Sequence, residues 1–179
     1  MLIILLSTVI IHVCPRASLS LPDTLKQNGI YFSADDYIKS KLSFPFDKKD
    51  AIHFREPFFS HTLLLKTADT MYHFYYDDLW GYRRRGNDIR VWNDKPYHLF
   101  YHGKIYLYDE DILTDNVNIH TMYFSTGADT PVKELNKKNL EEAYHANKKF
   151  IQKLSKLKWY QSLYRKNKQT GTYQFIDWF

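Results

Sequence analysis

The chain has 179 residues, of which 17% are aromatic and 25% charged, and its formal net charge is +5. This length fits one domain with a hydrophobic core of its own. The only cysteine is Cys14, so residues 21–179 are excluded from forming disulfides or thiolate metal sites.

The first 20 residues are predicted to be a signal peptide. Met1–Val13 is almost entirely Leu, Ile and Val, which suits the apolar region of such a peptide and is shorter than the roughly 20 residues that span a bilayer. Ser18 and Ser20 place small residues where signal peptidase cleaves, so we expect a single secreted or periplasmic domain over residues 21–179. Because no Lys or Arg precedes the apolar run, an uncleaved membrane anchor is the alternative.

A strand and a short helix are predicted next. Gly29–Ser33 has the composition of a strand, and Ser33 followed by two aspartates is a typical helix N-cap with acids in the first turn. The helix is expected to end near Lys41. Residues 43–60 show no periodicity and are predicted to be irregular.

Short aromatic and aliphatic runs separated by turn residues then recur about every eight to ten residues, which is typical of an antiparallel β-meander. The predicted strands are Thr62–Lys66, Met71–Tyr76, Leu79–Arg83, Asp88–Trp92, Tyr97–Tyr101, Lys104–Tyr108 and Ile119–Ser125. Turns are expected at Arg85-Gly86-Asn87 and at Asn93-Asp94, and His102-Gly103 is predicted to be a two-residue hairpin turn.

Both faces of this sheet are rich in apolar side chains. Ile105 and Leu107 are predicted to point to one side, and Tyr106 and Tyr108 to the other. In the preceding strand the residues expected to share one face are Tyr97, Leu99 and Tyr101. If either face were exposed to water, its apolar area would be larger than the apolar patches that soluble proteins usually expose. Both faces are therefore expected to be covered, by the chain itself or by a bound partner.

The C-terminal part changes to a helical pattern. Thr130-Pro131 and Asn136 are two candidate helix starts. Apolar residues from Leu140 to Leu154 share one face opposite a row of lysines, which predicts an amphipathic helix docked on the core, with a break at Asn147. Gly171–Phe179 alternates like an edge strand.

Charge is unevenly distributed along the chain. Residues 137–168 contain ten Lys or Arg and two acids, 10 − 2 = +8. A solvated helix face explains this pattern, and a basic C-terminal helix that faces an anionic surface is the sharper hypothesis.

Arginines beside aromatic residues give the best candidate for a binding site, because this combination holds phosphate, carboxylate or sugar groups. The candidate contact residues are Trp80, Tyr82, Arg83, Arg84 and Trp92. A charged sheet edge that resists aggregation is the alternative interpretation.

Catalytic signals are sparse. The histidines form no metal-binding motif, and neither a metal nor another cofactor is predicted. The enzymatic hypothesis is a small hydrolase that uses a His/Asp pair on the sheet, with His73 or His98 paired with Asp77 or Asp78.

Three short motifs carry a family resemblance: Gly29-Ile30-Tyr31, Leu79-Trp80-Gly81-Tyr82, and Phe124–Asp129 followed by Pro131. At these positions the chain resembles a loose group of uncharacterised exported single-domain proteins of Gram-negative bacteria. The resemblance implies export and a single domain, and it brings no functional residues.

Together these patterns predict an α+β fold: an antiparallel β-meander or partial barrel with C-terminal helices packed against it. The predicted function is a non-enzymatic binding or interaction module of the cell envelope. Its expected partner is an envelope glycan or protein, and nucleic acid is disfavoured because the chain is exported.

Overall fold

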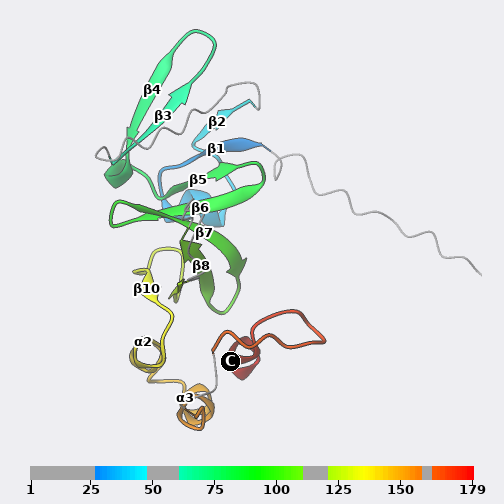
Figure 1. Cartoon of the computed structure of the whole chain (residues 1–179). Helices are drawn as coiled ribbons and strands as arrows, with labels where there is room; N and C mark the ends of the chain where they lie inside the picture. Colours follow the sequence, from blue (N-terminus) through cyan, green and yellow to red (C-terminus); the bar gives the residue numbers. More distant parts are fainter. Residues whose placement is uncertain (1–26, 48–60, 111–120, 159–162) are drawn as a thin grey trace, which may run out of the picture.

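An open antiparallel sheet forms the centre of the fold (Figure 1). The computed structural model describes residues 27–47, 61–110, 121–158 and 163–179. Eight strands pair in the order β10-β9-β8-β7-β6-β5-β1-β2, and β3 and β4 form a separate two-stranded sheet. The predicted α+β meander with C-terminal helices is therefore confirmed, whereas the strands do not close into a barrel.

The strands are β1 (Asn28–Tyr31), β2 (Phe44–Phe46), β3 (Thr62–Lys66), β4 (Met71–Tyr75), β5 (Gly81–Arg84), β6 (Asn87–Trp92), β7 (Lys95–His102), β8 (Tyr106–Glu110), β9 (Met122–Ser125) and β10 (Lys133–Glu134). The α-helices are α1 (Ala34–Ile38), α2 (Lys137–Ala143) and α3 (Lys148–Ser155), and the 3-10 turns are η2 (Tyr76–Asp78) and η3 (Gln174–Trp178). The predicted signal peptide, residues 1–20, lies outside the described residues.

Two hairpin turns of the meander follow from local chemistry. Arg85 and Gly86 join β5 to β6 with φ of 51° and 82°, and Asn93 and Asp94 join β6 to β7 with φ of 47° and 59°. Left-handed conformations at both central positions match the right-handed twist of the flanking strands. Both predicted turns are confirmed.

The third hairpin differs from the prediction. His102 pairs with Tyr106, so the loop is Gly103–Ile105 and the predicted two-residue turn at His102-Gly103 is wrong. The register between β7 and β8 also shifts between Leu99 and Tyr101. Such a bulge inserts one extra residue and turns the following side chain over. Tyr101 consequently packs on the opposite face of the sheet from Leu99.

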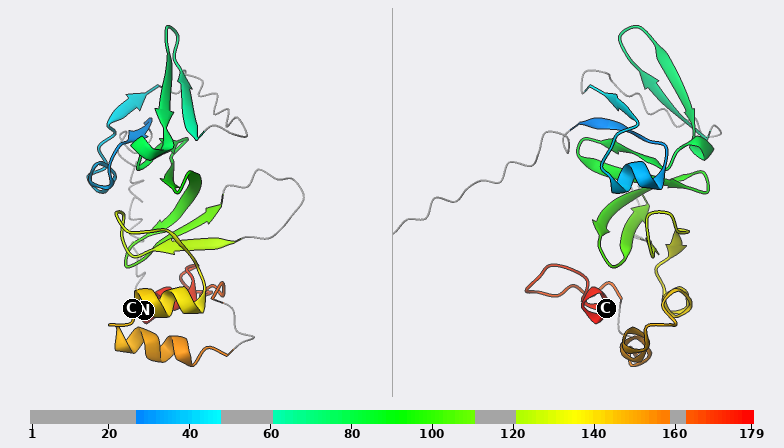
Figure 2. Two further views of the ribbon diagram at one scale, coloured as in Figure 1. Left: turned by 90° about the vertical axis from the view of Figure 1, so that its left-hand side faces the viewer. Right: turned by 180° about the vertical axis from the view of Figure 1, so that it is seen from behind.

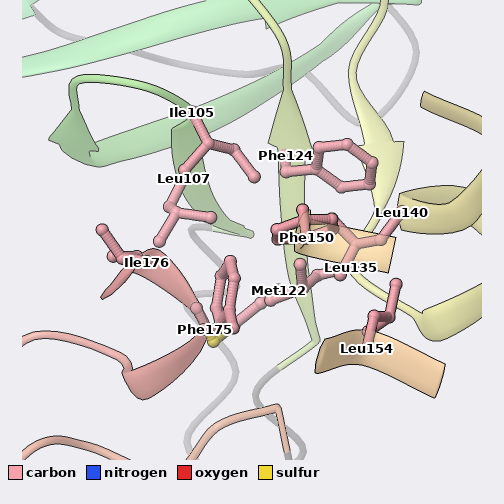
Figure 3. Packing of buried hydrophobic residues seen from close by; sticks show 10 residues of the cluster. All are labelled: Ile105, Leu107, Met122, Phe124, Leu135, Leu140, Phe150, Leu154, Phe175 and Ile176. Atoms are coloured by element: carbon pink, nitrogen blue, oxygen red, sulfur yellow. The ribbon is translucent and has the colours of Figure 1, made fainter. Parts of the chain in front are cut away.

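One face of the sheet has two separate covers. Over β1, β5 and β6, the cover is the β3–β4 hairpin, whose Leu63 and Leu65 are fully buried against Ile89 and Val91. Over β8 and β9, the cover consists of α2, α3 and η3, whose buried residues enclose Leu107 (Figure 3). The hairpin lies at one end of the molecule and the two helices at the other (Figures 1 and 2).

The opposite face is covered by α1 and by the segment that joins β9 to β10. Tyr37 from α1 stacks on Trp80 with ring centroids 4.1 Å apart, and Ala128 is buried beside them. Tyr108, at the centre of this face, is inaccessible to solvent. The tyrosine-rich side of the sheet is thus an interior surface.

The helix caps agree with the sequence analysis. The Ser33 hydroxyl accepts a hydrogen bond from Asp36 N at 3.1 Å, and Asn136 and Asn147 cap α2 and α3 in the same manner. The predicted break at Asn147 is confirmed, because this residue begins a second helix. Thr130-Pro131, in contrast, does not start a helix. The Thr130 hydroxyl instead accepts from Gly127 N at 2.8 Å within the connecting loop.

Two other segments differ from their predictions. Phe44–Phe46, within the stretch predicted to be irregular, forms β2 by pairing with β1. Gly171–Phe179 does not form a strand. It makes one isolated bridge, Lys166 with Tyr173, and then the 3-10 turn η3, whose Phe175 is buried in the core.

Candidate functional site

The predicted contact residues are distributed over both faces of the sheet. Trp80, Tyr82 and Arg83 are buried, and Arg84 and Trp92 are half-buried. Tyr82 packs beneath the β3–β4 hairpin, whereas Trp80 and Trp92 lie on the opposite face. The structure therefore does not bring these five residues together on one surface, and binding through them remains a prediction.

Arg83 is engaged inside the protein. Its Nε and Nη2 donate to the two carboxylate oxygens of Asp88 at 2.7 and 2.9 Å, a bidentate pair across the β5–β6 hairpin. The guanidinium also lies 5.6 Å from the ring centroid of Tyr31. Burial, and next the negative charge of Asp88, raise the pKa of the Tyr31 phenol above its ordinary value. This arrangement keeps Tyr31 neutral and gives Arg83 a local counter-charge.

Arg90, which the sequence analysis did not single out, is the centre of a cluster that we call the Arg90 cluster: Arg90, Trp80, Trp92, Tyr108, Ser125 and Thr130. The side chain is only 2% exposed. It donates through Nη1 to Tyr108 Oη and Ser125 Oγ at 3.1 and 3.2 Å, and through Nη2 to the Thr130 carbonyl at 2.7 Å. The rings of Trp92, Trp80 and Tyr108 lie 5.1–5.9 Å from its guanidinium carbon, which suits cation–π attraction.

The Arg90 cluster fixes the β9–β10 connection over the sheet. Trp80 Nε1 donates to the Ala128 carbonyl at 2.6 Å, and Ser125 Oγ donates to the Gly127 carbonyl at 2.8 Å. The three motifs that carry the family resemblance meet at or beside this cluster. Trp80 and residues 125–128 are bonded within it, and the Tyr31 ring packs edge-on against Trp80 with ring centroids 6.0 Å apart. Because these polar groups bind one another inside the protein, we interpret the cluster as a structural support.

A histidine–carboxylate pair lies on the face of the sheet that carries the β3–β4 hairpin and the C-terminal helices, between these two covers. His98 and Asp109 are opposite each other on β7 and β8, and Nδ1 of the imidazole is 2.9 Å from Oδ1 of the carboxylate. Their side chains are 32% and 37% exposed. His98 therefore pairs with Asp109 and not with the predicted Asp77 or Asp78, which belong to η2.

The surroundings of this pair include aromatic and basic groups. Phe100 and Tyr173 have ring centroids 6.0 Å apart, and Lys166 Nζ lies 5.4 Å from the Tyr173 centroid. Burial, and next the charge of Asp109, raise the pKa of the Tyr173 phenol. When Nδ1 of His98 carries the proton and its N–H donates a hydrogen bond to Asp109 Oδ1, Nε2 is the basic nitrogen, which is the arrangement that general base catalysis requires.

The outward side of the β3–β4 hairpin exposes large apolar side chains. Leu63 and Leu65 face the core, whereas Met71 and Tyr75 are 53% and 61% exposed. His73, the other histidine of the enzymatic hypothesis, is exposed on the same strand. Exposed apolar residues that gather on one element are typical of interaction surfaces.

No described helix is long and apolar enough to cross a lipid bilayer. Within the described ranges, no group of three or more His, Asp or Glu side chains is placed to hold a metal ion. Comparisons with protein-family models, curated proteins and solved structures found no match to this chain.

Proposed function

We propose that this protein is a non-enzymatic interaction module of the cell envelope that binds a protein partner through the outward side of the β3–β4 hairpin. The observation that carries the proposal is the exposure of Met71 and Tyr75 on β4. Export to the periplasm or beyond is part of the proposal, and it rests on the apolar run at residues 1–13.

The chemistry of the hairpin favours a protein partner over a glycan. Met71, a thioether, and the half-buried Leu64, an aliphatic residue, lie on the same side of the hairpin as Tyr75. Flexible methionine and rigid aromatic side chains are enriched in protein interfaces. A tyrosine buries roughly 150–250 Å² when it is covered completely, so Tyr75 has the size of an interface anchor.

Site-specific photo-crosslinking tests the proposed surface. The photoreactive amino acid p-benzoylphenylalanine replaces Tyr75 in one version of the protein and Ile38 in a control, because these apolar residues are 61% and 62% exposed. In the cells that make the protein, we expect position 75 to give a discrete adduct with another protein and position 38 to give none. Equal adducts at both positions, or none at 75, would contradict the proposal.

Export is tested separately by N-terminal sequencing of the protein from its native cells. We expect the mature chain to begin at Leu21, after cleavage behind Ser20. A chain that begins at Met1 would refute cleavage and leave the membrane anchor as the remaining alternative.

A second candidate function is supported by the His98–Asp109 pair, whose 2.9 Å contact fits a small hydrolase. The test is hydrolysis of p-nitrophenyl esters by the parent, His98→Gln and Asp109→Asn proteins, with His145→Gln as control because His145 is an exposed histidine that belongs to neither candidate pair. Loss of activity in the first two variants only would support the hydrolase. Equal rates in all four proteins would eliminate it.

A further inference from the structure

The C-terminal third of the chain contains a strongly basic surface. Residues 143–176 include no Asp or Glu, and the next acid, Asp177, accepts a hydrogen bond from Asn167 Nδ2 at 3.0 Å. Eight basic side chains in this stretch are exposed: Lys148, Lys149, Lys153, Lys156, Lys158, Arg165, Lys166 and Lys168. We call this set the basic surface. It belongs to α3 and to the segment before η3, at the end of the molecule opposite the β3–β4 hairpin (Figures 1 and 2).

The core fixes the orientation of α3. Phe150 and Leu154 are fully buried in the cluster of Figure 3, and Asn147 caps the helix by accepting from Phe150 N at 3.1 Å. At 100° per residue, Lys149 and Lys156 lie on the side opposite these two residues and Lys153 lies at the flank of the helix. All three lysines are exposed. The apolar face is thus occupied within the protein, and the lysine face points to solvent.

The acids of the described residues do not pair with Lys149, Lys153 or Lys156. Glu141 and Glu142 of α2 approach Lys137 and Lys133 at 3.9 and 3.0 Å. Among the described residues, no carboxylate lies within 4.0 Å of Lys149, Lys153 or Lys156. Like charges held close together on a rigid helix repel one another and attract an external anionic surface.

We propose that the basic surface binds the anionic headgroups of a lipid membrane. Seven of its eight residues are lysine, a compact charge without the planar fork that arginine offers to single phosphates or bases. Tyr164, which is 44% exposed, is adjacent in sequence to Arg165, and tyrosine is enriched at membrane interfaces.

Vesicle sedimentation tests this proposal with the full-length chain. The probes are vesicles of phosphatidylcholine alone and vesicles with one third phosphatidylglycerol, and a double-stranded DNA oligonucleotide serves as the competing polyanion. The test variant carries Lys149→Gln, Lys153→Gln and Lys156→Gln. The matched control carries Lys41→Gln, Lys66→Gln and Lys95→Gln, which removes the same charge from exposed positions elsewhere in the fold.

Each lysine near an anionic bilayer contributes roughly fivefold to the partition coefficient, so the test variant should bind phosphatidylglycerol vesicles about a hundredfold more weakly than the parent. The control variant should bind nearly as well as the parent. About 0.5 M salt should release the parent and the control variant from the vesicles. Residues 1–20 are common to all three proteins, so their contribution cancels in the comparison.

The proposal is overturned by equal binding to both kinds of vesicle, by equal losses in the two variants, or by no vesicle binding at all. Binding to DNA but not to phosphatidylglycerol vesicles would also overturn it. None of these outcomes bears on the hairpin surface, because the crosslinking experiment examines a different end of the molecule.

Discussion

Substitution of Trp80 by Phe tests whether the Arg90 cluster supports the fold. The indole donates through Nε1 to the Ala128 carbonyl at 2.6 Å, and both residues are buried. Phe keeps an aromatic ring for stacking on Tyr37, but it removes the donor. The Ala128 carbonyl is then buried without this partner in the β9–β10 connection.

The expected loss can be worked out from these contacts. A buried carbonyl without its hydrogen bond costs about 1–3 kcal/mol. The smaller ring also removes about 40 Å² of buried apolar surface, worth about 1 kcal/mol. We therefore expect Trp80→Phe to lower the free energy of unfolding by about 3 kcal/mol.

Urea denaturation followed by circular dichroism measures this change. With an m-value of about 2 kcal/mol per M, the midpoint should fall by about 1.5 M. Trp92→Phe is the matched control, because Trp92 is a half-buried tryptophan of the same cluster, and its expected loss is below about 1 kcal/mol. A midpoint for Trp80→Phe within about 0.3 M of the parent would refute the reasoning.

Three further predictions concern a cap, two glycines and a tyrosine. Asn147→Ala removes the cap of α3 and should cost about 1 kcal/mol in urea denaturation. Gly81→Ala would place a Cβ 2.2 Å from the Ile89 carbonyl oxygen and should cost about 3 kcal/mol or more, whereas Gly86→Ala, in open space at φ 82°, should cost about 1 kcal/mol. Burial, and next the charge of Glu110, raise the pKa of Tyr123 to about 12. Between about pH 10 and 12 the phenol therefore stays protonated in the folded state and ionises in the unfolded state, so stability falls as pH rises. Tyr123→Phe should lose less stability than the parent over that window, as measured by urea midpoints at several pH values.

The parts of the fold that sequence predicted are those determined by local chemistry. The turns at Gly86 and at Asn93-Asp94 need left-handed backbone, which these residues adopt readily. Asn136 is a typical cap residue and caps α2 as predicted, and the predicted break at Asn147 is where α3 begins. Each of these signals is complete within a few residues, so no knowledge of distant partners was required.

Features that depend on distant pairing could not be predicted in this way. Phe44–Phe46 is only three residues long and contains a proline, and it is a strand because β1 lies beside it. The alternation of Tyr173 and Phe175 suggested a strand, but Phe175 enters the core from a 3-10 turn. Tyr101 changes face because of a bulge, which strict alternation does not reveal.

The candidate sites were predicted only in part for the same reason. Arg90 lies between two aliphatic residues of β6, and an arginine in a strand is usually taken to face solvent. Its burial depends on Trp80, Tyr108 and Ser125, which come from other parts of the chain. His98 was a predicted candidate, but its partner Asp109 could be identified only from the β7–β8 register.

The outward side of the β3–β4 hairpin raises a question that folding alone does not answer. A two-stranded ribbon packs one side on the sheet, and here Leu63 and Leu65 occupy that side. Threonine at positions 71 and 75 would satisfy β geometry equally well, so the exposed Met71 and Tyr75 are not explained by the core. We therefore expect the double variant Met71→Thr/Tyr75→Thr to unfold within about 0.5 kcal/mol of the parent.

The double variant distinguishes a surface that binds a partner from a surface that stabilises the hairpin. With the photoreactive residue placed at His73, between the two substituted positions, the double variant should lose the adduct that the parent hairpin gives, while its urea midpoint stays unchanged. If the midpoint instead falls by more than about 0.3 M, Met71 and Tyr75 stabilise the folded hairpin itself. Their exposure would then no longer argue for a partner.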